Sequence, residues 1–349
     1  MLQFFRYIIS YLRRQCVKRH FFLVLTILLI IPAILSIAVG EKEDVSGGVI
    51  KYYSDNDESE LDPLANNIVA GTGLQLEPLR LSSGEAWARV AAEAPNIGAD
   101  MHFGWPLSFA LMAKEKGLLM KYKSPAWKNI SAEYKDPEGY WYGWSYWFAC
   151  IAVNTKLLNE KGYEMPKSWQ DLLDPKWKGE IVMPNPGTSG TAFLTVSTIM
   201  QLYGEEAGWD YLGKLDANVA QYTKSGSAPA QLVGQGEYII GITWDQAVQK
   251  RKDEGYPLEL VIPEEGTGYV LDVGVIYKNT ENPGGAKKFI DYIGSKEFHE
   301  EVAKYRSKVT YPGVEALVKF DPKLIDYDAS WAAENRERIM SNWKAKFAK

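Results

Sequence analysis

The amino-acid sequence predicts an α/β fold of two lobes, in which mostly parallel sheets are covered by helices. Between residues 47 and 305, strand-like runs alternate with helical runs, which is the pattern of parallel strands joined by helical crossovers. Two long strand candidates, 142–154 and 269–278, enclose a block of their own and would carry the chain between the lobes. The length of 349 residues also suits two domains of ordinary size.

The first part of the chain supplies three strand–helix pairs. Strands are predicted at 47–55, 74–83 and 99–105, and the helices that follow them at 60–73, 84–94 and 106–117. In the second helix, Trp87, Val90 and Ala94 recur at helical spacing. In the third, Pro106 stands at the start and Gly117 just past the end, where each residue is favoured.

The aromatic run GYWYGWSYWFACIAVNT at 139–155 favours one long strand, and a second block of elements follows it. The expected elements are a helix and turn at 166–179, helices at 193–204, 205–218 and 227–237, strands at 180–185, 219–223, 238–244, 258–266 and 268–279, and a helical pair at 282–305. We therefore predict that 41–154 and 269–317 form one discontinuous lobe and that 155–268 form the other. Residues 318–349 would add a C-terminal helical extension.

Residues 1–40 have the pattern of an export segment. Five basic residues and no acidic residue occur in 1–20, and the apolar run FFLVLTILLIIPAILSIAVG follows at 21–40. This pattern is typical of a signal peptide or of an N-terminal membrane anchor, and both alternatives stay open. Ala38 and Gly40 offer a cleavage site, and no cysteine directly follows the run to carry a lipid. We expect the rest of the chain to be periplasmic or otherwise extracytoplasmic.

The exported part is acidic and has one cysteine. Residues 41–349 contain 34 basic and 44 acidic residues, which argues against nucleic acid as a partner. An anionic ligand would therefore depend on local donors rather than on the overall field. Only Cys150 remains beyond the export segment, so no internal disulfide is expected and the fold must rest on its core.

Three strand-to-helix junctions share a Ser-Gly signature. Such residues cap the first turn of a helix, and the same helix end can hold an anion, because it offers free N–H groups and the positive end of a dipole. Ligands of open α/β sheets bind beyond the carboxyl ends of the strands, where all three junctions would lie. We expect an anion-binding cleft, with simple capping as the alternative for each loop. The candidate residues are Ser54, Ser82, Ser83, Gly84, Thr188, Ser189, Gly190, Thr191, Ser225, Gly226 and Ser227.

The sequence lacks the common catalytic motifs. It has no G-x-S-x-G elbow, no H-E-x-x-H pair, no Walker loop and no G-x-G-x-x-G fingerprint. His102 and His299 are too few for a histidine-rich metal site. Asp245 and the pair Glu264-Glu265 suit hydroxyl-binding carboxylates better than a general acid and base. We expect no cofactor, and an enzyme of unknown class stays as the remote alternative.

Several ordered motifs resemble the extracellular solute-binding proteins of ABC importers. The chain looks most like the branch of ferric-iron, 2-aminoethylphosphonate and hexose-phosphate binders, over about residues 47–310. The resemblance implies a type II periplasmic binding protein fold, with a ligand between two lobes joined by crossing strands. It also implies a monomer that delivers its solute to an ABC permease in the membrane. The motifs are PKSWQDLLDPKWKGEIVMPNPGTSGTAF, GWDYLGKL, QYTKSGSAPAQLVGQGEYIIGI and PEEGTGYVLDVGVIYKN.

The resemblance also bears on the ligand. Ferric-iron members carry adjacent tyrosines just after the strand that here reads YIIGITWDQAV, whereas this chain has Trp244-Asp245 there and places Tyr52-Tyr53 in its first strand. Hexose-phosphate members usually have His-Asp at that place, so Asp245 matches and Trp244 does not. We therefore expect a small phosphorylated or phosphonate solute held by the Ser-Gly loops, with Trp244, Asp245 and Glu265 contacting the rest. The alternative is a ferric-iron binder with a co-bound anion.

Overall fold

The computed structural model describes residues 48–317 and 319–347, which belong to one compact unit spanning Ser46–Lys349. The predicted export segment, 1–40, lies outside the described residues. Within the described ranges, no helix combines the length and the apolar character that a membrane span requires. Whether residues 1–40 are cleaved or serve as an anchor therefore stays a prediction.

The strands form one continuous sheet. Their order is β2-β1-β3-β9-β4-β7-β5-β6, and β8 pairs with β4 beside this path. The bounds are β1 Val49–Ser54, β2 Gln75–Arg80, β3 Met101–Pro106, β4 Tyr142–Asn154, β5 Ile181–Pro184, β6 Val219–Thr223, β7 Ile240–Trp244, β8 Leu258–Val261 and β9 Tyr269–Ile276.

The helices follow the strands in alternation, as the sequence predicts. The α-helices are α2 Glu58–Thr72, α3 Ser83–Glu93, α4 Leu107–Glu115, α5 Thr155–Lys161, α6 Gly190–Tyr203, α7 Glu205–Asp216, α8 Ala228–Gln235, α9 Asp245–Asp253, α10 Pro283–Ile293, α11 Lys296–Val302 and α12 Ala329–Phe347. Short 3-10 turns are η1 Pro125–Asn129, η2 Ala132–Tyr134, η3 Gln170–Leu173 and η4 Pro175–Trp177.

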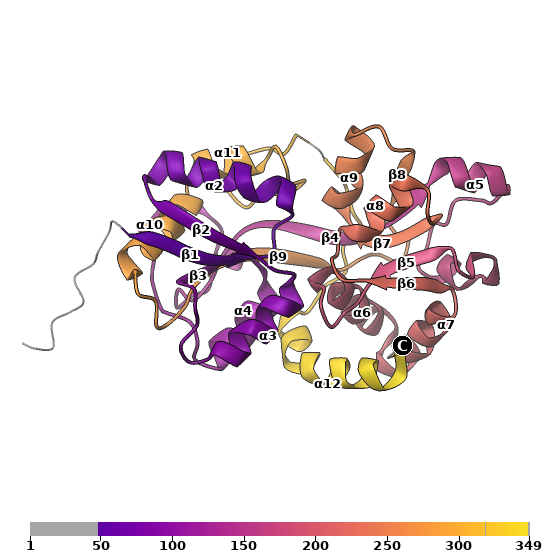
Figure 1. Ribbon diagram of the computed structural model, residues 1–349, viewed down its shortest axis with the longest axis horizontal. Coiled ribbons are helices and arrows are strands. Elements are labelled where there is room, and N and C mark those ends of the chain that lie inside the picture. Colours follow the sequence, from indigo (N-terminus) through magenta and orange to yellow (C-terminus); the bar gives the residue numbers. More distant parts are fainter. Residues whose placement is uncertain (1–47, 318, 348–349) are drawn as a thin grey trace, which may run out of the picture. The chain divides into compact units, whose positions relative to one another are not determined.

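The sheet has two parallel parts joined by long antiparallel strands. Strand β1 pairs parallel with β2 and β3, and β5 pairs parallel with β6 and β7. Strand β4 pairs antiparallel with β9 over Tyr142–Phe148 and with β7 over Ala149–Val153, so it serves both parts. Figure 1 shows β4 and β9 running between the two groups of strands. The single strand β4 confirms the long strand predicted at 139–155. We propose that the lobes divide at the predicted boundaries, 154/155 and 268/269.

Helices cover both faces of each part. On the β1–β3 part, α2, α10 and α11 lie on one face and α3 and α4 on the other (Figure 1). Each of these faces has its own apolar cluster, one around Phe103 and Phe289 and the other around Trp105 and Phe109. A third cluster fills the β5–β7 part. Strand β4 is buried along almost its whole length, as a continuous apolar run requires.

Two short helices are absent from the sequence-based expectations. Helix α5 has only seven residues between its caps Asn154 and Gly162, and α9 is a polar segment, DQAVQKRKD, with little apolar periodicity. Conversely, the helix expected within 166–179 is a pair of 3-10 turns. Pro175 starts the second of them directly after Asp174, and a proline restricts the preceding residue to extended conformations.

Candidate ligand-binding cleft

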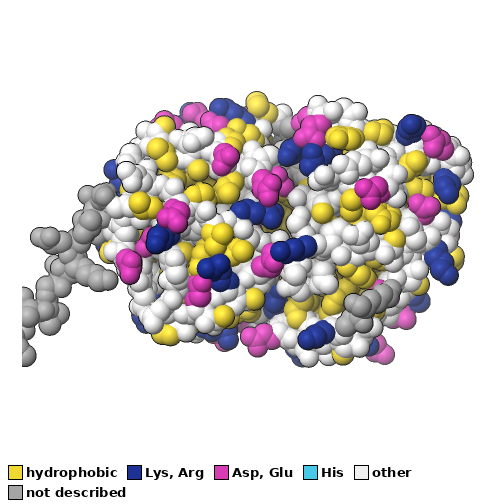
Figure 2. Space-filling view, in the orientation of Figure 1, with side chains coloured by type: hydrophobic (Ala, Val, Ile, Leu, Met, Phe, Trp, Pro, Cys, Tyr) yellow, Lys and Arg dark blue, Asp and Glu magenta, His cyan; other side chains and the backbone are white. Residues whose placement is uncertain are grey.

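The N-termini of three helices meet at one pocket. The N-cap residues are Ser82 for α3, Ser189 for α6 and Ser227 for α8, and all three line it. Figure 2 shows a narrow hollow between the two halves, flanked by basic and acidic side chains. With the open solvent at its mouth, the space is about 450 Å³. Its lining residues are Asp55, Asp57, Arg80, Ser82, Ser83, Gly104, Trp147, Ser189, Gly190, Thr191, Gly226, Ser227, Trp244, Asp272 and Arg306.

Parallel strands bring these helix ends together. Strands β2, β5 and β6 each end just before a junction, so the junctions lie at the carboxyl ends of the strands, as the sequence predicts. Ser83, Thr191 and Ser227 line the same pocket although they come from three junctions. The Ser189 hydroxyl accepts a hydrogen bond from Ala192 N at 3.4 Å, so it caps α6 and keeps its own proton free to donate.

The β1–β3 part and the β5–β7 part, here called the two halves, approach closely at this pocket. The backbone N–H of Gly84 in α3 donates to the carbonyl of Thr188 at 2.9 Å. A Cβ on Gly190 would lie 2.5 Å from Ser83 Oγ, which is closer than real Cβ contacts, so only glycine fits there. Lys224 Nζ lies 2.8 Å from Glu85 Oε1, again joining the loop before α8 to α3. These contacts position the three helix ends around one small volume.

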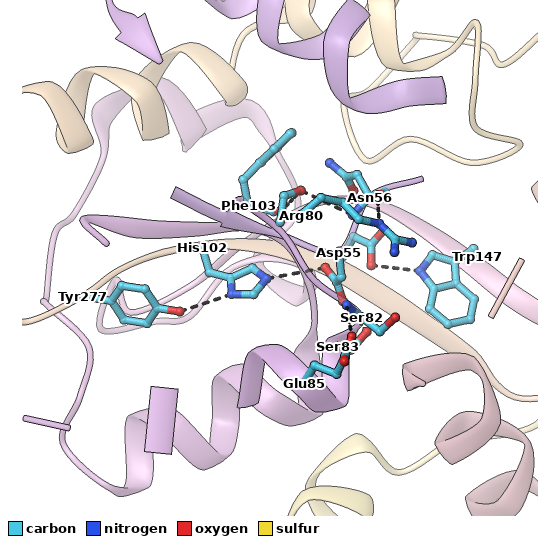
Figure 3. A network of polar contacts seen from close by, with 12 residues as sticks. Asp55, Asn56, Arg80, Ser82, Ser83, Glu85, His102, Phe103, Trp147 and Tyr277 are labelled. Atoms are coloured by element: carbon cyan, nitrogen blue, oxygen red, sulfur yellow. Dashed lines mark hydrogen bonds and ion pairs between the residues drawn. The ribbon is translucent and has the colours of Figure 1, made fainter. Parts of the chain in front are cut away.

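Arg80, the last residue of β2, is the pocket's uncompensated cation. Its side chain is half-buried, and its Nε donates to the carbonyl of Asn56 at 3.4 Å. Among the described residues, no carboxylate lies within ion-pair distance of it. Figure 3 shows its guanidinium and Trp147 on the other side of Asp55 from His102. A guanidinium without a carboxylate partner is suited to bind an anion in a bidentate way.

A chain of side chains runs behind the pocket from Ser83 to Tyr277 (Figure 3). Asp55 accepts a hydrogen bond from the Ser83 hydroxyl, and its other oxygen lies 3.6 Å from His102 Nε2. His102 Nδ1 lies 3.2 Å from the Tyr277 hydroxyl. Burial lowers the pKa of His102, so the ring is neutral near pH 7. The aspartate stands between the serine and the histidine, an order that does not activate Ser83 as a nucleophile.

The Ser82 hydroxyl differs from that of Ser83. It is buried, and it faces the backbone N–H of Glu85 in a capping box without making an ordinary hydrogen bond to it. The Ser82 backbone N–H instead donates to Glu85 Oε2 at 3.3 Å. A buried hydroxyl without a partner is costly, so Ser82 is available to a ligand in this pocket.

A second arginine, Arg306, lines the pocket but carries its own counter-charges. Its Nη2 lies 2.7 Å from Glu60 Oε2, and its Nη1 lies 3.2 Å from Asp272 Oδ2. Burial raises the pKa of Glu60 to about 7, against the lowering effect of Arg306. Burial also raises the pKa of Asp272. The pocket thus contains one free and one compensated guanidinium.

The structure places eight of the predicted site residues in this pocket. They are Ser82, Ser83, Ser189, Gly190, Thr191, Gly226, Ser227 and Trp244. Gly84 and Thr188 instead bond to each other across the two halves, and Ser54 Oγ donates to the carbonyl of Phe103 at 2.8 Å. Ser225 Oγ lies 3.3 Å from Ser227 Oγ, one step behind the lining.

The two predicted carboxylates are used elsewhere in the fold. Asp245 is buried, and it accepts hydrogen bonds from Phe148 N at 3.3 Å and from Ser307 Oγ at 2.5 Å. Burial raises its pKa to about 6. Glu265 accepts from Trp169 N at 3.1 Å, where it helps to start η3. Neither lines the pocket, so we correct our expectation: the carboxylates that line it are Asp55, Asp57 and Asp272.

Seven lining residues are not among the sequence-based candidates. Asp55 and Asp57 follow β1 and Arg80 directly precedes LSSG, so the rule about strand ends that selected the serines could have found them. No such local signal marks the other four. These are Gly104, Trp147 and Asp272, within strands, and Arg306, in a loop after α11.

The adjacent tyrosines of the iron alternative lie outside the pocket. Burial raises the pKa values of Tyr52 and Tyr53, that of Tyr53 to about 12, which disfavours the phenolate that binds Fe(III). The Tyr53 hydroxyl donates to Glu93 at 2.7 Å. In the described part of the chain, no group of three or more His, Cys, Asp or Glu side chains is arranged to hold a metal ion.

The fold and this cleft define a two-lobed carrier of small solutes. The chain belongs to the family of bacterial extracellular solute-binding proteins, whose model matches residues 94–331. It is 37% identical over 281 residues to an uncharacterised protein of Haemophilus influenzae, covering 76% of this chain and 81% of that protein. It is 29% identical over 258 residues to a probable ABC transporter periplasmic-binding protein of Sinorhizobium fredii, covering 71% of this chain and 70% of that protein.

A solved structure agrees over a larger share of the chain. It is the periplasmic binding protein AfuA of Actinobacillus pleuropneumoniae with exogenous fructose-6-phosphate bound, at 34% identity and a TM-score of 0.82, covering 86% of this chain and 99% of that one. Putative 2-aminoethylphosphonate-binding proteins and ferric-ion-binding proteins also match, the latter at 20% identity, which shows the fold alone. The fold is therefore the type II periplasmic binding protein fold. The protein is the exported solute-binding component of an ABC importer, which hands its ligand to a membrane permease.

Proposed function

We propose that the cleft binds a small phosphorylated or phosphonate solute and that Arg80 and the three helix N-termini hold its anionic group. The observation that carries the proposal is Arg80, a guanidinium without a carboxylate partner among the described residues, in a pocket lined by three N-caps. Each helix end contributes the positive end of a dipole and those first-turn N–H groups that the caps and the bond from Gly84 to Thr188 leave open. Charge-assisted hydrogen bonds to phosphoryl oxygens are about twice as strong as neutral ones.

The remaining lining suits a polyhydroxyl body on that ligand. The carboxylates of Asp55, Asp57 and Asp272 can accept hydrogen bonds from hydroxyl groups. The rings of Trp147 and Trp244, whose centroids lie 5.7 Å apart, offer apolar faces. The fructose-6-phosphate in the AfuA structure supports this class of solute. A ferric ion would need several hard anionic ligands around one point. The lining offers no tyrosine, and among the described residues no group of three or more His, Cys, Asp or Glu side chains is arranged to hold a metal ion.

The test is the ligand that the protein carries from its own cell. Protein purified without refolding should release a phosphate ester or phosphonate, seen by mass spectrometry of the denatured supernatant, and should contain less than one tenth of an equivalent of iron. A stoichiometric Fe(III) content with a visible tyrosinate band would show that the ligand class is wrong. A neutral sugar or an amino acid in the supernatant would do the same.

We also propose that residues 1–40 export the protein, either as a cleaved signal peptide or as a membrane anchor. The support is their basic start and apolar run together with the exported family. N-terminal sequencing of the protein from its native envelope distinguishes the two. A start near residue 41 indicates cleavage, and an intact Met1 in the membrane fraction indicates anchoring.

A further inference from the structure

Arg306 is held almost completely inside the protein, at the wall of the cleft. It follows α11, it is 3% exposed, and it lines the pocket. Both terminal nitrogens are engaged: Nη1 faces Asp272, and Nη2 faces Glu60 and also donates to Asn56 Oδ1 at 3.3 Å. The guanidinium is thus fixed at one end by three side chains.

Two tryptophan rings lie against this guanidinium. Its central carbon lies 5.3 Å from the ring centroid of Trp144 and 4.9 Å from that of Trp244. Trp144 belongs to β4, and Trp244 ends β7, which pairs with β4 on the side of β5 and β6. A guanidinium stacked on aromatic faces and ion-paired at both terminal nitrogens has little freedom to reorient.

The third nitrogen of Arg306 has no partner. Its Nε is buried, and it makes no hydrogen bond within the part of the chain that the structure describes. A buried N–H without an acceptor is costly, and buried donors in native proteins are nearly always satisfied. The side chain lines the cleft, so the cleft is the place from which an acceptor for this N–H would come.

We propose that Arg306 is a ligand-binding residue that donates its Nε–H to an uncharged oxygen of the solute, apart from the phosphoryl group. The inference rests on the proposed function of the cleft. Burial raises the pKa of Glu60 and of Asp272, yet either carboxylate alone balances the single positive charge of Arg306, and Asp55 adds a further negative charge nearby. A phosphoryl dianion would be repelled beside these carboxylates, whereas a hydroxyl can accept from Nε and donate to Asp272. Arg80, which has no such counter-charge, takes the phosphoryl group instead.

The first experiment compares two arginine variants with two probes. Hexose 6-phosphate has a phosphoryl group and a hydroxyl body, and inorganic phosphate has only the former. Arg306→Lys keeps the positive charge for Glu60 and Asp272 but loses the Nε–H. It should bind hexose 6-phosphate roughly 3- to 10-fold more weakly, the range expected for one lost neutral hydrogen bond, and inorganic phosphate within twofold of wild type. Arg80→Gln should weaken both probes.

The second experiment needs no variant that has to fold. The side-chain Nε–H resonance of Arg306, assigned through bonds in the wild-type protein, should shift on addition of hexose 6-phosphate and stay in place with inorganic phosphate. If inorganic phosphate shifts it equally, Arg306 holds the phosphoryl group and the inference is wrong. If hexose 6-phosphate binds without a shift, Arg306 is a structural residue only. If wild type binds neither probe, the proposed function itself has failed.

Discussion

The two arginines of the cleft show how environment sets the role of one side-chain type. Arg80 ends a strand at the sheet edge, is half-buried, and has no carboxylate partner among the described residues. Arg306 is buried, paired with Glu60 and Asp272, and stacked on two tryptophans. The first offers a net charge to a ligand, and the second offers one well-placed N–H. Counter-charge, rather than the presence of an arginine, therefore decides which one attracts the anion.

The largest effect should come from removing the free charge. Arg80→Gln keeps a polar side chain but loses the bidentate cation. If two charged hydrogen bonds are lost, at about 1.5–3 kcal/mol each, affinity for a phosphate ester should fall by roughly 100-fold or more. Calorimetry measures this. Arg338→Gln removes a cation that is paired with Glu205 at the surface and does not line the pocket, and as the matched control it should change affinity by less than about fivefold.

The next effect tests the close approach of the two halves. Gly190→Val adds a side chain where even a Cβ meets Ser83 Oγ at 2.5 Å and Pro106 Cγ at 3.2 Å. We expect affinity to fall at least as far as for Ser189→Ala, because the valine side chain fills the pocket and holds the two halves apart. Gly213→Ala, in α7 with nothing within 4 Å of the added Cβ, is the control. Unchanged binding by Gly190→Val would show that no ligand enters at α6.

Ser189→Ala separates capping from ligand binding. Its hydroxyl caps α6 through Ala192 N, so its loss should cost about 0.5–2 kcal/mol of stability in either case. If it also donates to a phosphoryl oxygen, affinity should fall by roughly 10- to 150-fold. Ser295→Ala removes the matching cap of α11, where Ser295 Oγ accepts from Phe298 N at 3.1 Å. That variant should lose stability alone, and equal affinity losses in both variants would contradict the ligand role.

The smallest effect is a pH dependence of the stability that Asp245, a buried carboxyl near Arg306, contributes. Burial raises the pKa of Asp245 to about 6, so the folded state binds a proton more tightly than the unfolded state. The stability of wild type relative to Asp245→Asn should therefore fall as pH rises from about 4 to 6. Burial lowers the pKa of His299 to about 4, and this makes the stability of both proteins rise with pH over the same range. The effect of Asp245 is therefore seen only in the difference in stability between wild type and Asp245→Asn. Urea unfolding at pH 4.5 and 7 measures it, and a pH-independent difference would contradict it.

Local signals in the sequence predicted the positions of the helix-start serines better than they predicted the roles of the charged side chains. Ser82, Ser189 and Ser227 stand at helix starts, so pattern and capping preference place them at one sheet edge. Asp245 stands at a similar place, at the end of β7, yet its carboxylate turns toward Phe148 and Ser307. Spacing does not show which way a side chain turns at a strand end.

The pairs around Arg306 lie beyond sequence-based reasoning for a different reason. Glu60, Asp272 and Arg306 are far apart along the chain, and no periodicity joins them. Their meeting depends on the crossing of β9 and on the loop after α11, both of which are set by packing. From the sequence alone, nothing distinguishes Arg306 from a surface arginine, although it is among the most buried charged residues of the described part of the chain.

The central claim is that the cleft recognises a phosphoryl group through Arg80 and the helix N-termini. The most direct measurement is the calorimetric affinity of wild-type protein for a hexose 6-phosphate and for the same hexose without phosphate. The account predicts tight binding of the ester and at least about 100-fold weaker binding of the free sugar, since the charged hydrogen bonds are lost. Equal affinity for the two, or tighter binding of the free sugar, would contradict it.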